Sequence, residues 1–268
     1  MGSAKAGVIG WPVSHSLSPK LFRYWLKTYN LQGIYEALAI PPDALRDAVF
    51  SMVEQGYAGM NVTLPHKEGV LRLVDDADEA AQAVGAVNMI TVKNGKLYGT
   101  NTDTYGFTQN LKQKKFPGKK EKAIVLGAGG AARAVVKALA DEGFKAIVIS
   151  ARTATKARAI ADRIDVVSWE KRHAALGDAD LLVNATSLGM EGQEPLMMDL
   201  GLLPGGAVVY DLVYRPLETE LLQQAKARGN PVVDGLGMLI HQAVPAFEAW
   251  FGVKPEVDAK VRQHLLSA

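Results

Sequence analysis

Residues 123–132 have the sequence Ala123-Ile124-Val125-Leu126-Gly127-Ala128-Gly129-Gly130-Ala131-Ala132, and this segment sets the fold class. Its first four residues predict a buried strand, and residues 131–141 predict a helix. Between them, Gly127-x-Gly129-x-x-Ala132 fits the dinucleotide fingerprint, in which the glycines allow a tight turn and close approach of a pyrophosphate to the backbone. A plain tight turn also uses such glycines, but the position between strand and helix favours a nucleotide site. Its residues would be Gly127, Ala128, Gly129, Gly130 and Ala131.

Strands and helices alternate downstream of this loop. Apolar runs predict strands at residues 146–150, 181–183 and 208–210, and a helix is predicted at 155–164. This order is typical of a Rossmann-type, doubly wound domain with a parallel sheet.

The rest of the chain predicts a second, mixed α/β domain. Strands are expected at residues 6–10, 34–39, 59–62 and 86–92, and helices at 19–29, 42–55 and 67–74. Asn94-Gly95 is a two-residue hairpin signal, so part of this sheet should be antiparallel. Helices at 236–250 and 255–266 are expected to fold back onto the first domain. We therefore expect two domains, with residues 1–101 in the first, 102–236 in the second and 237–268 returning to the first.

Composition excludes several classes of function. The chain has 268 residues, 48% of them apolar, and its 30 basic and 28 acidic residues give a charge of +2, so no overall field favours nucleic acid or a membrane. The absence of cysteine excludes disulfides and thiolate nucleophiles, and no histidine has helical metal-ligand spacing, so we expect no metal. With no apolar run of ~18 residues or more and no cleavable leader, we expect a cytoplasmic protein.

The segment after the second strand of the nucleotide domain indicates which cofactor binds. In NAD-binding domains this strand ends in an acidic residue, whereas here the sequence is Ser150-Ala151-Arg152-Thr153-Ala154-Thr155-Lys156. Arg152, Thr153 and Lys156 can receive a 2′-phosphate, which favours NADP. Thr153 or Thr155 capping the next helix is a compatible alternative.

Two short segments concentrate reactive side chains, Asn61-Val62-Thr63-Leu64-Pro65-His66-Lys67 and Asn101-Thr102-Asp103. A lysine and an aspartate brought together can move a proton to or from a hydroxyl, so Lys67 and Asp103 are candidate catalytic residues. The alternatives are that Lys67 begins a surface helix and that Asp103 caps one. The polar residues at the ends of apolar strands, where open α/β sheets form their ligand crevice, are Asn61, Thr63, Asn88, Asn101 and Thr102.

Two further polar segments have both a structural and a binding interpretation. Ser16-Leu17-Ser18-Pro19 predicts a helix start with Ser18 as N-cap and Pro19 in the first helical position, and it also predicts a site for a small carboxylate. Asn184, Thr186 and Ser187 follow a strand of the nucleotide domain, either as a polar turn or as contacts to nicotinamide and ribose.

These segments, taken in order, resemble the motifs of the shikimate dehydrogenase family over essentially the whole chain. The family pattern appears as Ser16 to Pro19, Asn61 to Lys67, Gly85 to Asn88, Asn101 to Asp103, Gly127 to Ala131, Arg152-Thr153, Asn184 to Ser187, Tyr214, Asp234 to Leu239 and Gln242. The resemblance implies an NADPH-dependent reductase that interconverts 3-dehydroshikimate and shikimate, in the pathway to chorismate and the aromatic amino acids. It also implies a cleft between the two domains.

Residue roles follow from the resemblance. It implies that Lys67 and Asp103 are the catalytic pair, and that Ser16 and Ser18 bind the shikimate carboxylate. The remaining substrate contacts would be Asn61, Thr63, Asn88, Tyr214 and Gln242, and further cofactor contacts Leu212, Gly235 and Met238. Two departures are Ala151, where asparagine often precedes the Arg-Thr pair, and Pro245, which should bend or end the helix that carries Gln242.

Two other functions fit parts of the sequence. A quinate/shikimate dehydrogenase of broader cofactor use is disfavoured by the missing acidic residue after Ser150. A non-catalytic metabolite-binding module would not need Lys67 and Asp103. We expect small molecules as partners and a monomer or homodimer.

Overall fold

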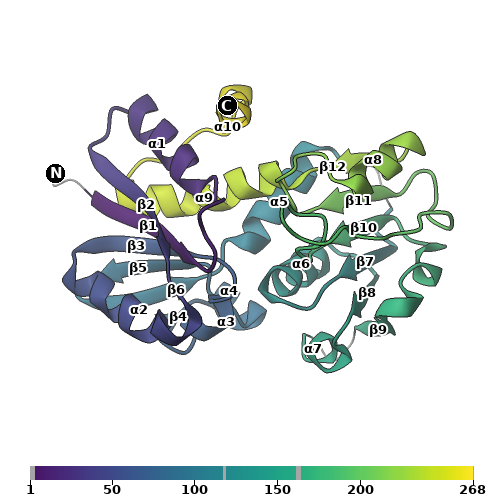
Figure 1. The fold of residues 1–268 in the computed structure, drawn as a ribbon, viewed down its shortest axis with the longest axis horizontal. Coiled ribbons are helices and arrows are strands. Elements are labelled where there is room, and N and C mark those ends of the chain that lie inside the picture. Colours follow the sequence, from purple (N-terminus) through teal and green to yellow (C-terminus); the bar gives the residue numbers. More distant parts are fainter. Residues whose placement is uncertain (1–3, 117–118, 161–163, 268) are drawn as a thin grey trace. The chain divides into compact units, whose positions relative to one another are not determined.

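The computed structural model describes residues 4–116, 119–160 and 164–267 (Figure 1). The chain divides into two compact units, Met1–Thr102 with Leu239–Ala268, and Asp103–Met238. Within the described residues each unit contains one six-stranded sheet. No helix in this part of the chain is long and apolar enough to cross a membrane.

The sheet of the first unit is mixed, as predicted. Its strand order is β2-β1-β3-β5-β6-β4, with β1, β2 and β3 parallel and β5 antiparallel to both β3 and β6. The strands are β1 (Ala4–Gly10), β2 (Gly33–Ala39), β3 (Tyr57–Val62), β4 (Asp76–Ala77), β5 (Met89–Lys93) and β6 (Lys96–Thr100). Asn94 and Gly95, with φ of 52° and 75°, form the β5–β6 turn, so the predicted hairpin is confirmed.

Helices cover this sheet with aromatic and aliphatic side chains. They are α1 (Ser18–Thr28), η1 (Pro42–Ala44), α2 (Leu45–Glu54), α3 (Lys67–Val70), α4 (Glu79–Val84), the end of α9 (Gly235–Phe251) and α10 (Ala259–Leu266). The ring of Phe247 in α9 lies 5.3 Å from that of Trp25 and 5.7 Å from that of Phe22, both in α1. Tyr24 stacks on His264 of α10 at 4.6 Å. The last two helices therefore pack on α1, the first helix of this unit.

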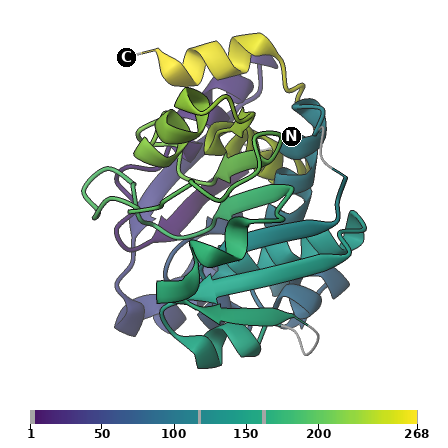
Figure 2. The same cartoon turned by 90° about the vertical axis from the view of Figure 1, so that its right-hand side faces the viewer.

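The sheet of the second unit is parallel, in the order β12-β11-β10-β7-β8-β9. Figure 2 shows these strands side by side, coloured teal to green. They are β7 (Lys122–Leu126), β8 (Ala146–Ala151), β9 (Asp165–Ser168), β10 (Leu181–Asn184), β11 (Val208–Asp211) and β12 (Val232–Val233). Numbered within the unit, this is the doubly wound order of dinucleotide-binding domains, with its switch point between β7 and β10.

Apolar runs in β7 and β10 explain why this sheet is covered on both faces. Val125 packs in a cluster with Phe107, Val135 and Leu139, whereas its neighbours Ile124 and Leu126 pack in a second cluster with Leu182 and Leu221. Successive strand residues point to opposite faces, so a fully buried run needs helices on both. The helices are α5 (Asp103–Gln113), α6 (Gly130–Asp141), α7 (Ala154–Arg158), η2 (Trp169–Lys171), η3 (Ala174–Leu176), α8 (Glu220–Ala227) and the start of α9.

Several predicted elements differ in extent from the structure. The helix after Lys67 ends at Val70 and not at residue 74, and residues 161–163 of the predicted helix 155–164 lie outside the described residues. Pro245 was predicted to bend or end its helix, and the second alternative is wrong, because α9 continues through Pro245 to Phe251. The sequence placed domain limits after residues 101 and 236, and the units divide after Thr102 and Met238.

Candidate active site

Strand register gathers polar residues at one edge of the first unit's sheet. Asn61 lies near the carboxyl end of β3, opposite Met89, which begins β5, and Met89 lies opposite Thr100, which ends β6. Because β5 runs antiparallel to β3 and β6, Asn88 and Asn101 flank these residues at the same edge. Three segments far apart in sequence therefore meet there.

Asn88 is the centre of a buried hydrogen-bond network at this edge. Its Oδ1 accepts from the Thr102 amide at 2.7 Å, and its Nδ2 donates to Thr102 Oγ1 at 3.0 Å and to Gln242 Oε1 at 3.4 Å. Thr102 Oγ1 in turn donates to the Gln242 carbonyl at 2.8 Å. The Asn88 amide is thus fixed in orientation, and Gln242 is tied to it despite Pro245 in the same helix.

Asn61 is held from two sides. Its Oδ1 accepts from the Tyr35 hydroxyl at 2.8 Å, and its Nδ2 donates to the Asn88 carbonyl at 3.3 Å. Asn101 Nδ2 similarly donates to the Ala86 carbonyl at 2.8 Å. Thr102 was among the polar residues that the sequence placed at the strand ends, whereas Tyr35 was not singled out, since its role depends on a pairing between distant segments.

Lys67 is the first residue of α3, and the sheet edge fixes its backbone. The Val87 amide donates to the Lys67 carbonyl at 2.9 Å, which joins it to the segment that leads into Asn88. The preceding His66 is buried, with Nε2 2.7 Å from the Ile40 carbonyl oxygen, and its amide donates to the Thr63 carbonyl at 3.0 Å. The ring of His66 therefore has a packing role, and it anchors the start of the helix.

The start of α1 corrects the predicted capping arrangement. Ser18 was expected at the N-cap, but Leu17 occupies that position in an αR conformation, and Ser18 is the first helical residue. Ser16 Oγ accepts from the Ser18 amide at 3.2 Å, so Ser16 is the serine that supports the helix start. Ser18 is buried and Ser16 half-buried.

In the second unit the predicted cofactor residues follow the carboxyl ends of parallel strands. Gly127 follows β7 with φ of +112°, and a Cβ there would lie 3.0 Å from the Ala185 carbonyl oxygen after β10. Gly129 is the N-cap of α6 and has open space where a Cβ would be. Within the described residues no side chain caps α6, so its first backbone amides are left without a side-chain acceptor. A tight turn and an anion-accepting helix start are both present, and they fit a pyrophosphate.

The basic residues after β8 fit a 2′-phosphate. Arg152, Thr153 and Lys156 are exposed, and neither basic side chain forms an ion pair with any residue in the described part of the chain. Thr153 is the N-cap of α7 but its side chain makes no capping hydrogen bond. Thr153 therefore occupies the N-cap position that the capping alternative gave it, but its side chain does not act as a cap.

The loops after β10 and β11 hold the remaining predicted cofactor residues. Asn184 Oδ1 accepts from the Thr186 amide at 3.1 Å and from its hydroxyl at 2.7 Å, which folds the loop that carries Ser187. A Cβ on Gly235 would collide with the Leu212 carbonyl, so only glycine lets α9 start against that loop. Met238 is buried and Tyr214 half-buried.

Asp103 is buried and begins α5 as the first residue of the second unit, whereas Lys67 belongs to the first unit. Within the first unit the structure brings together Asn61, Asn88 and Gln242, along the edge that also holds Thr63 and Lys67. Within the second it gathers the glycine loop with the residues after β8, β10 and β11.

Three family models match this chain. The shikimate dehydrogenase substrate binding domain matches residues 8–90, shikimate / quinate 5-dehydrogenase matches 110–194, and the shikimate 5'-dehydrogenase C-terminal domain matches 235–265. A relative from Paramagnetospirillum magneticum, named shikimate dehydrogenase (NADP(+)), is 51% identical over 98% of this chain and 98% of its own. The chain belongs to the shikimate dehydrogenase family.

Solved structures agree with this membership. A shikimate 5-dehydrogenase from Thermus thermophilus, in complex with NADP(H) and shikimate, is 38% identical with a TM-score of 0.88, covering 98% of each chain. A quinate dehydrogenase from Corynebacterium glutamicum, in complex with NAD, is 30% identical with a TM-score of 0.91, covering 99% of each chain. The predicted two-domain α/β fold with a Rossmann-type sheet is confirmed.

Proposed function

We propose that this chain is an NADP-dependent shikimate dehydrogenase, which interconverts 3-dehydroshikimate and shikimate. The observation that carries the proposal is the polar edge of the first sheet, where Asn61, Asn88 and Thr102 are oriented by one buried network. A polyhydroxylated substrate requires several fixed donors and acceptors, and this edge supplies them in a chain of the matching family.

Substrate binding is assigned to this edge and to the segment before α1. Ser16 and Ser18 would take the carboxylate, because hydroxyls and a helix start favour an anion. The ring hydroxyls would be held by Asn61, Thr63, Asn88, Gln242 and, from the second unit, Tyr214. The fixed amide orientation of Asn88 supports its role, since it sets which group faces a ligand.

Proton transfer is assigned to Lys67 and Asp103. In shikimate oxidation the Asp103 carboxylate and Lys67 Nζ hold the reacting hydroxyl. As the carbon–hydrogen bond breaks, the hydroxyl proton passes to Lys67 and the groups hydrogen-bonded to it. In the reverse direction the same groups return the proton to the carbonyl oxygen. A cleft between the two domains, in which the pair would meet, stays a prediction.

The cofactor residues fit NADP. The backbone amides that start α6 would bind the pyrophosphate, and Arg152 with Lys156 would bind the 2′-phosphate. Asn184, Thr186, Ser187, Leu212, Gly235 and Met238 would line the nicotinamide side. When bound, NADP supplies the hydride acceptor for the oxidised carbon.

The similarity to a quinate dehydrogenase supports one alternative function, a quinate/shikimate dehydrogenase of broader cofactor use. That protein was solved with NAD, and this chain has no acidic residue from Ser150 to Lys156 to hold a ribose 2′-hydroxyl. The exposed Arg152 and Lys156 therefore favour NADP over NAD. Cytoplasmic location and a monomeric or homodimeric state stay predictions from the sequence.

Reduced-cofactor formation measured spectroscopically tests the function. Rates with shikimate or quinate, each paired with NADP or NAD, should be highest for shikimate with NADP. A higher kcat/KM for quinate with NAD would instead establish the quinate enzyme. If none of the four substrate and cofactor pairs is turned over, the proposal is overturned in favour of a metabolite-binding module.

A further inference from the structure

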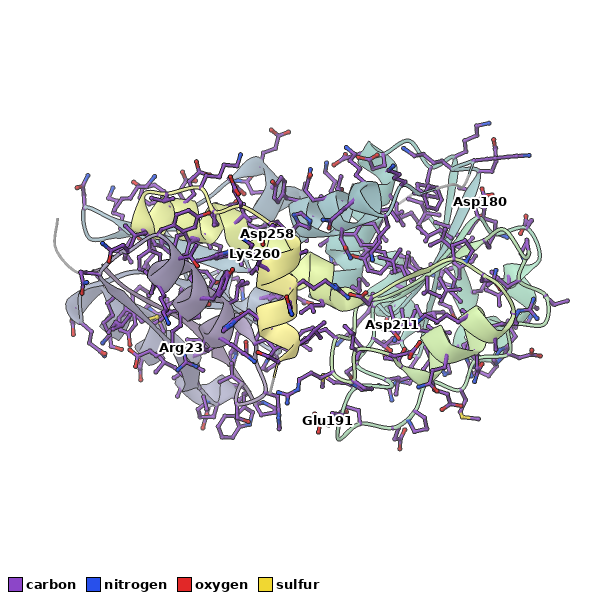
Figure 3. The ribbon with its side chains drawn as sticks, turned by 90° about the horizontal axis from the view of Figure 1, so that it is seen from above. Arg23, Asp180, Glu191, Asp211, Asp258 and Lys260 are labelled. Atoms are coloured by element: carbon purple, nitrogen blue, oxygen red, sulfur yellow. The ribbon has the colours of Figure 1, made fainter. Side chains whose placement is uncertain are left out.

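Asp211 is a buried carboxylate to which the function above gives no role. It ends β11 in the second unit, where Figure 3 labels it, and its side chain has no exposed surface. Its Oδ1 accepts from Asn184 Nδ2 at 2.9 Å and from the Val213 amide at 3.0 Å, and its Oδ2 accepts from the Thr219 hydroxyl at 2.7 Å. Burial raises its pKa to about 6 although these three donors oppose the shift.

These hydrogen bonds connect three separate segments. Asn184 belongs to the end of β10 and organises the following loop, donating to the Leu188 carbonyl at 3.1 Å and accepting from Thr186. Val213 belongs to the loop after β11, between Leu212 and Tyr214. Thr219 is the N-cap of α8, where it accepts from the Leu222 amide at 3.4 Å. One carboxylate therefore sets the spacing between two ligand-side loops and ties both to a helix.

A buried carboxylate is costly to keep, because folding removes it from water. Apolar residues could fill the end of a buried strand at lower cost, but they could not accept three hydrogen bonds from three segments. The loops that Asp211 joins carry Thr186, Ser187, Leu212 and Tyr214, which are all assigned to ligands above. This geometry gives the carboxylate a role in alignment.

We propose that Asp211 is a positioning residue of the NADP-dependent reaction, which holds the loop after β10 and the loop after β11 in the arrangement that binds NADP and places Tyr214. This inference rests on the proposed function. Asp211 itself does not touch the reacting atoms.

Replacing Asp211 separates positioning from plain stability. Asp211→Ala leaves three donors without an acceptor, and we expect it to weaken NADP binding by roughly 10- to 150-fold and to lower kcat. Asp211→Asn should retain most of the wild-type NADP affinity and kcat. Its amide oxygen can accept from Asn184 and Val213, and its NH₂ can donate to Thr219. The measurements are NADP titration by intrinsic fluorescence, steady-state kcat and KM, and thermal melting.

Asp180 provides the matched control. Its Oδ2 accepts from the Glu121 and Lys122 amides at 2.7 and 3.2 Å, at the amino ends of β7 and β10 and away from the loops above (Figure 3). Asp180→Ala should lower the melting temperature while leaving NADP affinity and kcat within about twofold of wild type.

Thr219→Val tests the network when Asp211→Ala does not fold. It removes the donor to Oδ2 and the side-chain cap of α8, and it should still weaken NADP binding by about threefold to tenfold. Asp258→Ala controls for the lost helix cap, because Asp258 caps α10, which has eight residues like α8. Asp258→Ala should leave NADP binding unchanged.

Two results would overturn the inference. One is an Asp211→Ala or Thr219→Val variant with a lower melting temperature but with NADP affinity and kcat within about twofold of wild type. The other is an equal loss of NADP affinity in the Asp180 or Asp258 control. NADP titration does not require turnover, so wild-type protein that binds NADP but fails to oxidise shikimate would refute the proposed function separately.

Discussion

The two sheet edges that carry the candidate site hold their polar groups differently. In the first unit, buried side chains bond to one another, as when Asn88 meets Thr102 and Gln242. In the second unit, the glycine loop offers backbone amides beside open space at Gly129, and the cations Arg152 and Lys156 are exposed.

This difference follows from what each edge is proposed to bind. Ring hydroxyls each need a donor or acceptor in a fixed direction, so their partners must be oriented by neighbours. Phosphate oxygens accept from any amide and respond to charge over a longer range, so a helix start and exposed basic side chains are enough. Substitutions at the first edge should therefore affect chemistry, and those at the second should affect cofactor affinity and choice.

The largest effect is expected at the first edge, for Lys67→Ala. Loss of a positioned proton-transfer group should lower kcat by roughly 10²- to 10⁴-fold, with a smaller change in shikimate KM. Steady-state kinetics on folded protein measure this. Lys96→Ala, at the hairpin end of the same sheet, should stay within about twofold of wild type. Near-normal kcat in Lys67→Ala would make Lys67 a plain surface residue.

The next effect concerns pH and Asp211 in the second unit. Its pKa is raised by burial from an ordinary 3.8 to about 6, so between these values the folded state binds more protons than the unfolded state. The contribution of Asp211 to the free energy of unfolding should therefore fall as the pH rises from 3.8 to about 6. The total fall is as much as about 3 kcal/mol, and the contribution is constant at higher pH.

Urea unfolding at about pH 4.5 and about pH 7.5 measures this change. The side chain of the variant Asp211→Asn does not titrate. The free energy of unfolding of this variant, taken relative to that of wild type, should therefore be larger at the higher pH than at the lower pH. A relative stability that is equal at both values would show that the Asp211 pKa is not raised.

A cofactor-selective effect is expected at the second edge, for Arg152→Ala. Loss of a charge-assisted hydrogen bond should weaken kcat/KM for NADP by roughly 10- to 150-fold, while NAD, which lacks the phosphate, should change little. Lys156→Ala should act in the same direction but less, and Arg158→Ala in the same helix serves as control. Equal losses for NADP and NAD would mean that Arg152 does not contact the phosphate.

The smallest effects are expected for alanine substitutions of Gly127 and Gly129, two glycines of the same loop, which should differ from each other. Gly127→Ala should destabilise the fold by about 1–3 kcal/mol, because φ is +112° and Ala185 lies close. Gly129→Ala, with φ of −91° and open space, should cost less than about 1 kcal/mol but should reduce NADP affinity. Thermal melts and NADP titrations of both variants measure this. The loop assignment fails if Gly129→Ala binds NADP normally.

Locally encoded features were predictable from the sequence. The glycine loop, the Asn94-Gly95 hairpin and the parallel strands of the second unit depend on neighbouring residues and apolar runs. The N-cap at Leu17 was missed because its backbone is αR and no side chain caps the helix, so residue preferences gave no signal. Pro245 does not end its helix, because packing of Phe247 and Trp250 against α1 outweighs one missing backbone hydrogen bond.

Long-range networks were beyond sequence patterns. The roles of Tyr35, Thr102 and Asp211 arise from register and from partners as distant as Gln242, which lies 140 residues after Thr102. The polar ends of apolar strands predicted where such a network would form and several of its members, such as Asn61, Asn88 and Thr102, but not which side chains would bond to one another.

The assignment of shikimate binding to the first unit and NADP binding to the second is tested most directly by calorimetric titration of shikimate and NADP into Ser16→Ala and Arg152→Ala. Ser16→Ala should weaken shikimate by roughly 10-fold or more and leave NADP within about twofold, and Arg152→Ala should do the reverse. Because Ser16 also supports the start of α1, a melt confirms that each variant is folded. Equal weakening of both ligands by either variant would contradict the account.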